Sequence, residues 1–138
     1  EDFSASAGME PEADGLLWPN QQVVFAARSA GLLPLGFVGS IAQFGDLDAF
    51  RDTIRRSRRL GLRGGFCIHP DQVNIMNEEF SPAAEEVIAA REVLAAYQAA
   101  VDAGRGSAEY GGKMIDAPVV ARARETLACH HRIVSRKP

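Results

Sequence analysis

GGFCIH, residues 64–69, is a short apolar run on which the fold depends. A similar run, LLPLGFV, occupies residues 32–38, and each run follows a glycine, Gly31 or Gly61, of the kind that ends a helix. Neither run alternates apolar and polar residues, so each reads as a strand buried on both faces. We therefore predict two buried parallel strands, each reached through a helix.

Helical patterns alternate with these strands. Residues 1–18 read as a loop, the first helix is expected to open at Pro19, and Asp46 or Asp48 is expected to cap the second. This order predicts an α/β fold with a parallel sheet. Because two strands cannot close a barrel and a complete (β/α)8 TIM barrel needs roughly 250 residues, we expect residues 1–80 to form the C-terminal part of such a barrel.

The pattern changes in the second half of the chain. A short helix is expected over residues 70–80, and a longer one opens at Ser81 with Pro82 in its first turn and runs to Gly104. An extended connector then leads to a last helix that Asp116 opens. We predict that residues 81–138 form a helical arm with a lid segment.

Composition limits the classes of function. The chain has 138 residues, of which 46% are hydrophobic and 24% charged, and its formal net charge is −3. No basic field favours nucleic acid or an anionic membrane, and no apolar run approaches the roughly 18 residues of a spanning helix. Cys67 and Cys129 have no metal-ligand spacing, so a cytoplasmic protein is expected. Because the chain begins at Glu1 without methionine, we expect part of a longer protein.

Two features of the first half have both a chemical and an ordinary interpretation. Glu1 and Asp2 could hold a hard cation such as Mg²⁺, or they are simply exposed acids. His69 ends a predicted strand, where barrel enzymes collect ligand contacts, or it bonds only to nearby backbone. An arginine run is interpreted as a solvated helix face: Arg55, Arg56, Arg58, Arg59 and Arg63.

Asp116 is the third candidate. An aspartate before Ala-Pro is a good N-cap, which would explain it without chemistry. However, Gly111-Gly112 could act as a flexible hinge, and Met114-Ile115 could anchor a lid. A carboxylate carried by a lid can transfer protons in a closed site.

The motifs, taken together and in order, resemble the C-terminal half of the HpcH/HpaI aldolase and citrate lyase beta-subunit family, in particular its CoA-ester lyases. The resemblance covers about residues 1–128, and its most specific parts are the IHPxQ and MIDxP patterns. The matching segments are EDF (1–3), AARSAGL (26–32), GFCIHPDQV (65–73), NEEFSPAAEEV (77–87), AGRG (103–106) and GGKMIDAPVVARA (111–123).

This resemblance implies a carbon–carbon lyase. Members of the family are Mg²⁺-dependent (β/α)8 barrels, commonly homotrimers, that cleave or form 3-hydroxyacyl-CoA thioesters such as malyl-, citramalyl- or citryl-CoA. The products of cleavage are an acyl-CoA and an oxo acid. In that chemistry Mg²⁺ stabilises the developing oxyanion, and an acid must protonate the thioester enolate.

The resemblance also implies roles for single residues. Asp2 would be a Mg²⁺ ligand, Ile68 and His69 would lie against the CoA thioester, and Asp116 would be the lid acid/base that reaches a neighbouring subunit's site. The second carboxylate ligand of the family is not in this chain. Gly64-Gly65 departs from the Gly-Lys of many relatives, which leaves the acyl substrate open.

Two alternatives stay open. The chain could be a non-catalytic fragment that serves mainly subunit association, or part of a CoA-independent class II-type hydroxy-acid aldolase. In each case we expect the chain alone to lack lyase activity and tight Mg²⁺ binding, because one carboxylate rarely holds Mg²⁺ without further ligands.

Overall fold

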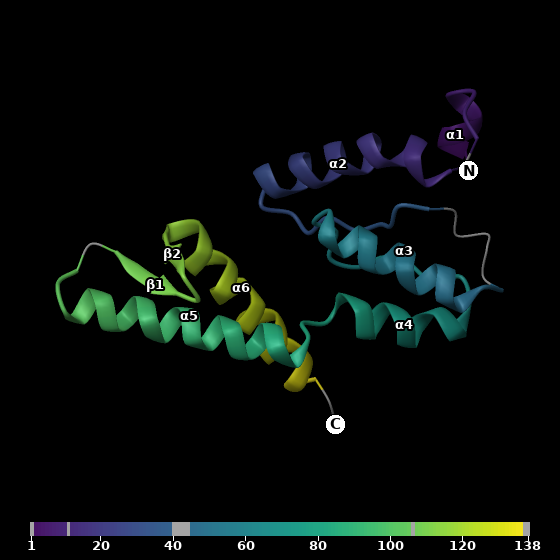
Figure 1. Cartoon of the computed structure of the whole chain (residues 1–138). Coiled ribbons are helices and arrows are strands. Elements are labelled where there is room, and N and C mark those ends of the chain that lie inside the picture. The colour runs from purple at the N-terminus through teal and green to yellow at the C-terminus, as the bar shows by residue number, and fades with distance from the viewer. Residues whose placement is uncertain (1, 11, 40–44, 106, 137–138) are drawn as a thin grey trace. The chain divides into compact units, whose positions relative to one another are not determined.

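The computed structural model describes residues 2–10, 12–39, 45–105 and 107–136. The chain divides into two compact units, Glu1–Phe80 and Ser81–Pro138, and each is described by itself (Figure 1). None of the helices in the described ranges is both long and apolar enough to cross a membrane. The elements are α1 (Asp2–Ser6), α2 (Ala13–Ser29), α3 (Leu47–Arg59), α4 (Pro70–Phe80), α5 (Ala84–Asp102), β1 (Ala108–Tyr110), β2 (Lys113–Ile115) and α6 (Ala117–Val134).

The loop predicted for residues 1–18 is wrong over much of its length. Helix α1 occupies part of it, and α2 begins at Ala13, so that Pro19 lies inside the helix rather than at its start. A proline there removes one backbone N–H from the helix. The side chain of Asn20 donates an additional hydrogen bond to the carbonyl of Leu16 at 2.8 Å, which supports the helix beside the proline.

The two glycines predicted to end helices do so. Gly31 and Gly61 take positive φ angles of 69° and 108°, a conformation that side chains disfavour. After the first of them, the N–H of Leu32 returns to the carbonyl of Ala27 at 2.7 Å, which closes the last turn of α2. Each helix therefore ends directly before one of the apolar runs.

Those two apolar runs contact each other but form neither the regular nor the buried strands that were predicted, since Leu33 is 62% and Phe66 75% exposed. The N–H of Gly36 donates to the carbonyl of Gly64 at 2.8 Å, and the N–H of Arg63 donates to the carbonyl of Pro34 at 2.9 Å. Both glycines have positive φ, 143° and 158°, so the chain leaves the pleat that a parallel ladder needs. Among the described residues, the assigned strands are β1 and β2 of the second unit.

Close packing fixes both runs against the helices. Buried Ser57 of α3 accepts a hydrogen bond from the N–H of Val38 at 2.9 Å and donates to the carbonyl of Thr53 at 2.7 Å. At Gly65, a Cβ atom would lie only 2.8 Å from the Met76 Cε atom of α4. The second run therefore packs directly against the Met76 side chain of α4.

Helices α3 and α4 pack side by side in Figure 1. Asp46 caps α3, because its Oδ1 accepts from the N–H of Ala49 at 2.9 Å, which decides between the two predicted caps. Two apolar side chains of α3 lie in the core, since Phe50 is 5% exposed and Ile54 is fully buried, whereas Leu47 is 37% exposed. The cluster around them consists of Phe50, Ile54, Ile75 and Met76, with Phe37, Cys67 and Phe80 at its edge.

Ion pairs also join α3 to α4, so the arginine run is not simply a solvated face. Glu79 of α4 accepts hydrogen bonds from Arg51 and, at 2.9 Å, from Nε of Arg55. Partial burial favours the protonated form of Glu79, but the two arginines outweigh that effect and lower the pKa of Glu79. The neighbouring Glu78 pairs with Arg51 at 2.9 Å and is 60% exposed.

In the second unit α5 begins later than predicted. The helix opens at Ala84 rather than at Ser81, because the Glu86 carboxylate accepts from the N–H of Ala83 at 2.7 Å and satisfies a donor at that point. The core between α5, the hairpin and α6 consists of Ala90, Val93, Ala100, Ala108, Ile115, Val120 and Ala123.

The predicted connector before α6 is an antiparallel hairpin. Strand β1 pairs with β2 in a register that sets Ala108 opposite Ile115. Gly111 and Gly112 form the two-residue turn, with φ of 58° and 73°. Two consecutive positive φ angles match the twist of a tight hairpin. The Gly-Gly pair predicted as a hinge therefore forms the tight turn of this hairpin.

We expect Ile54→Ala to lower the free energy of unfolding by about 2–5 kcal/mol, because it leaves a cavity in the α3–α4 core. Urea denaturation measures this value. Ile88→Ala on α5 is the matched control, since Ile88 is 54% exposed. Equal losses of stability in the two variants would contradict the described core.

We expect Glu79→Gln to reduce stability at neutral pH. A carboxylate whose folded-state pKa lies below its ordinary value, near 4.3, contributes stability above that value and loses it as the pH falls through the folded-state pKa. Urea denaturation of wild type and variant across pH measures the difference, which should shrink as the pH falls through the folded-state pKa of Glu79. Glu78→Gln should have a smaller effect. A Glu79→Gln deficit that is independent of pH would contradict the ion pair.

Candidate functional site

The end of the second apolar run is held by a glutamine that follows it. Gln72 lies in the first turn of α4 and is fully buried. Its Oε1 accepts from the backbone N–H groups of Ile68 at 3.0 Å and His69 at 3.3 Å. Its own N–H donates to the carbonyl of His69 at 3.1 Å. This reciprocal cap at the start of α4 fixes the backbone of both predicted site residues.

The side chains of the same two residues reach solvent. Ile68 is 58% exposed, and the side chain of His69 is 43% exposed. The Nδ1 atom of His69 accepts a hydrogen bond from the backbone N–H of Asp71 at 3.3 Å. The same atom lies 3.5 Å from the Asp71 carboxylate. An exposed apolar side chain beside an imidazole suits a ligand that has both apolar and polar parts.

Asp2 is exposed in the first turn of α1, rather than at a strand end. Its carboxylate is a ligand type that Mg²⁺ prefers, but Mg²⁺ needs further oxygen ligands. Within the described residues, no three His, Cys, Asp or Glu side chains gather as a metal site. Glu1, the predicted neighbour ligand, lies outside the described residues. The described part of the chain therefore does not complete a magnesium site.

Asp116 stands between the hairpin and α6. Its Oδ1 accepts a hydrogen bond from the N–H of Val119 at 3.1 Å, so the N-cap interpretation is confirmed. The side chain is exposed, and Oδ2 has no hydrogen-bond partner in the described part of the chain. Of the predicted lid anchor, Ile115 is 4% exposed, whereas Met114 is 72% exposed. The core thus holds the backbone before Asp116 while one carboxylate oxygen stays accessible.

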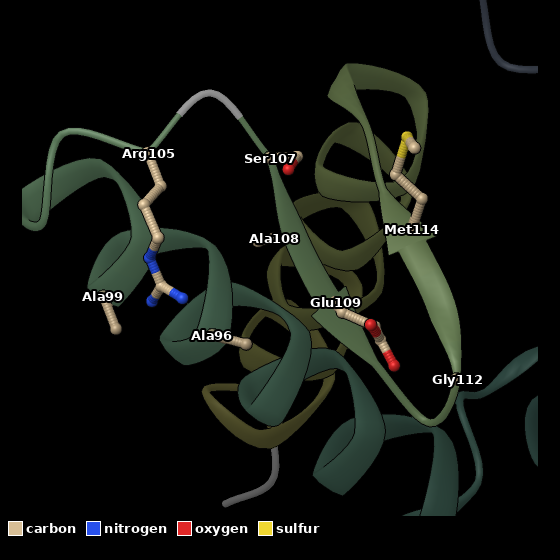
Figure 2. Close-up of a pocket in the computed structure, with 8 residues that line it drawn as sticks. All are labelled: Ala96, Ala99, Arg105, Ser107, Ala108, Glu109, Gly112 and Met114. Atoms are coloured by element: carbon tan, nitrogen blue, oxygen red, sulfur yellow. The ribbon is translucent and has the colours of Figure 1, made fainter.

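A groove of about 470 Å³ lies between the hairpin and α5. Figure 2 shows Ala96 of α5 on one side of it and Glu109 and Met114 of the hairpin on the other, with the Arg105 side chain extending along α5. None of the four predicted site residues lines this groove. Its complete lining is Ala96, Ala99, Arg105, Ser107, Ala108, Glu109, Gly112 and Met114.

The cysteines and the two remaining histidines of the described residues lie outside the candidate site. Cys67 and Cys129 are both free thiols. Burial raises the pKa of Cys67, which disfavours the nucleophilic thiolate. His130 and His131 lie in the last turns of α6, where positive charge is favourable.

Sequence reasoning missed two anchoring residues. Gln72 stands three positions after His69, the spacing of a capping box, and that spacing could have identified it. Tyr110 donates its hydroxyl hydrogen to the carboxylate of Glu92 on α5, and this bond raises the pKa of Tyr110. The structure thus connects Ile68 with His69 through Gln72 in the first unit, while Asp116 belongs to the second.

Comparison with known proteins identifies relatives of this chain, although no family model matches it. An L-malyl-CoA/beta-methylmalyl-CoA lyase of Cereibacter sphaeroides (strain ATCC 17025) is 38% identical over 116 residues, which are 84% of this chain and 36% of that protein. A citrate lyase subunit beta-like protein of Deinococcus radiodurans is 35% identical over 130 residues, 93% of this chain and 45% of that protein. The chain therefore spans less than half the length of these relatives.

A solved structure agrees with the sequence matches. Protein CitE of Mycobacterium tuberculosis, in complex with magnesium, acetoacetate and coenzyme A, superimposes with a TM-score of 0.64 and 27% sequence identity. The match covers 79% of this chain and 39% of CitE. Over the matched residues the chain is therefore similar to malyl-CoA lyases and citrate lyase beta-like proteins, and its resemblance to the CoA-ester lyases of the HpcH/HpaI aldolase family is confirmed.

Proposed function

We propose that the protein carrying this chain is a carbon–carbon lyase that cleaves or forms a 3-hydroxyacyl-CoA thioester, such as malyl-, citramalyl- or citryl-CoA. The observation that carries the proposal is the 38% identity to an L-malyl-CoA/beta-methylmalyl-CoA lyase over 84% of the chain. The CoA-bound structural relative supports a CoA ester over a free hydroxy acid as substrate. Acyl-CoA and an oxo acid are then the partners of the reaction.

Residues 1–80 are proposed as the C-terminal part of a (β/α)8 barrel, and residues 81–138 as its arm and lid. The hydrogen-bonded apolar runs, each preceded by a helix, support the barrel assignment. Large apolar side chains on the two runs stay exposed, which is expected of strands that continue into a larger sheet. These are Leu32 (65%), Leu33 (62%), Leu35 (43%), Phe66 (75%) and Ile68 (58%).

Ile68 and His69 are proposed to contact the CoA thioester. They are the last two residues of the second run, at what would be the carboxyl end of a barrel strand, where barrel enzymes place their ligand contacts. Their exposed side chains and fixed backbone support that role.

Asp116 is proposed as the acid/base. In cleavage, the hydroxyl proton passes to solvent as the carbon–carbon bond breaks, which leaves the electron pair on the acyl-CoA fragment as an enolate, and the other fragment departs as an oxo acid. Protonated Asp116 then donates a proton to the enolate carbon and regains one from solvent; in the reverse direction its carboxylate removes that proton. Its capping bond uses Oδ1, so Oδ2 can carry the proton without loss of the cap.

Mg²⁺ is proposed as the cofactor, with Asp2 as one ligand. The donor is of the right chemical type, but the further ligands are not among the described residues of this chain. When bound, the ion would supply Lewis-acid stabilisation of the developing oxyanion. We also propose a cytoplasmic homotrimer in which the lid is shared between subunits.

Asp116→Asn tests the proposed function. We expect turnover of a CoA ester to fall by about 10²–10⁴-fold, because Asn cannot transfer the proton. Stability should be unchanged, since Asn caps a helix about as well as Asp. Turnover is followed through the acyl-CoA product in the protein that carries this chain.

Asp46→Asn is the control for that experiment, because Asp46 caps α3 through Oδ1 just as Asp116 caps α6. The control should retain wild-type turnover. Near-normal turnover of Asp116→Asn would limit Asp116 to helix capping and would leave the proposed reaction without its proton donor.

Asp2→Asn tests the metal role. We expect the Mg²⁺ concentration for half-maximal activity to rise by at least about tenfold, because a charged ligand is replaced by a neutral one. Asp48→Asn is the control, since Asp48 is likewise an exposed aspartate in the first turn of a helix. An unchanged Mg²⁺ dependence in Asp2→Asn would remove this residue from the metal site.

A further inference from the structure

Gln72 keeps a buried hydrogen-bond donor without a partner. The residue is fully buried, and Nε2 is without a hydrogen-bond partner in the described part of the chain. The amide cannot turn over to correct this, because only Oε1 can accept from the N–H groups of Ile68 and His69. An unsatisfied buried donor destabilises a fold. Within the described part of the chain, the Gln72 side chain therefore acts through the two hydrogen bonds that Oε1 accepts.

We propose that Gln72 is a positioning residue, which holds the backbone of Ile68 and His69 in the conformation that receives the CoA thioester. This inference rests on the proposed function, in which those two residues lie against the thioester. Gln72 does not touch the substrate itself, because its side chain is fully buried.

The surrounding sequence explains why the backbone of Ile68 and His69 needs a clamp, by which we mean the Gln72 side chain that accepts from both of their N–H groups. Gly64 and Gly65 precede the site, and glycines give the backbone more conformational freedom than other residues. Pro70 follows it and has no N–H to donate. Without Gln72, the N–H groups of Ile68 and His69 would lose the acceptor that the structure gives them.

Pre-organisation is the physical effect of such a clamp. A binding segment that is already ordered loses less conformational entropy when the ligand binds. Loss of the clamp should therefore weaken substrate binding more than it slows the chemical step, because the proposed proton transfer belongs to Asp116. If Gln72 served only to cap α4, its loss would lower the free energy of unfolding. It would not raise KM more than it lowers kcat.

Gln72→Met is the main test, because methionine is close to glutamine in size and cannot accept these hydrogen bonds. In the whole protein we expect the KM for its CoA ester to rise at least about fivefold, with kcat changed less than about twofold. Hydrogen exchange of the Ile68 and His69 amides should become at least about tenfold faster. Gln72→Glu keeps an acceptor and should restore both values to near wild type.

Ile75→Ala is the control for a loss of stability on the same helix, since Ile75 is 5% exposed in the α3–α4 core. It should destabilise the protein without raising KM. A wild-type KM in Gln72→Met, or an equal rise of KM in Ile75→Ala, would overturn the positioning role of Gln72. Either result would leave the proposed function of the protein intact. A wild-type protein without lyase activity would overturn the proposed function and the positioning role with it.

Discussion

The first unit depends on two backbone hydrogen bonds between its apolar runs, from Gly36 to Gly64 and from Arg63 to Pro34. They bring together segments that a whole helix, α3, separates in sequence. Helices α3 and α4 then pack against the joined runs, through the Ser57 hydroxyl and through the close approach of α4 to Gly65. The second run thereby ends at a defined place, where the chain turns into α4. The proposed contacts to the CoA thioester lie at that end.

The second unit holds the exposed carboxylate of Asp116 in a fixed position. A buried residue, Ile115, directly precedes Asp116, and the capping bond to Val119 restrains the side chain itself. The hydrogen bond from Tyr110 to Glu92 adds a second attachment of the hairpin to α5. An acid/base group needs this kind of restraint, because proton transfer requires the donor and acceptor to meet in a defined geometry.

Local sequence signals predicted most of the helices. Positive-φ glycines at Gly31 and Gly61 ended α2 and α3 as expected, because the reason is confined to one residue. Other features required knowledge of neighbouring structure. Pro19 was mistaken for a helix start because proline is favourable there, although α2 accommodates it further along. The apolar runs have the composition of strands, but their own glycines interrupt the pleat.

For a similar reason, the sequence predicted some features of the candidate site and missed others. The capping bond of Asp116 follows a local pattern. The exposure of Ile68, which the apolar run predicts to be buried, and the burial of Gln72 both depend on the packing around them. Asp2 has a suitable carboxylate, but the further ligands that Mg²⁺ requires are not among the described residues.

The most direct measurement is the product analysis of the wild-type protein with malyl-, citramalyl- and citryl-CoA in the presence of Mg²⁺. A carbon–carbon lyase releases an acyl-CoA and an oxo acid in equal amounts and leaves the thioester bond intact. We predict that outcome with at least one ester, and its loss when Mg²⁺ is chelated. Release of free CoA without an oxo acid, or no conversion of any of the three esters, would contradict the account.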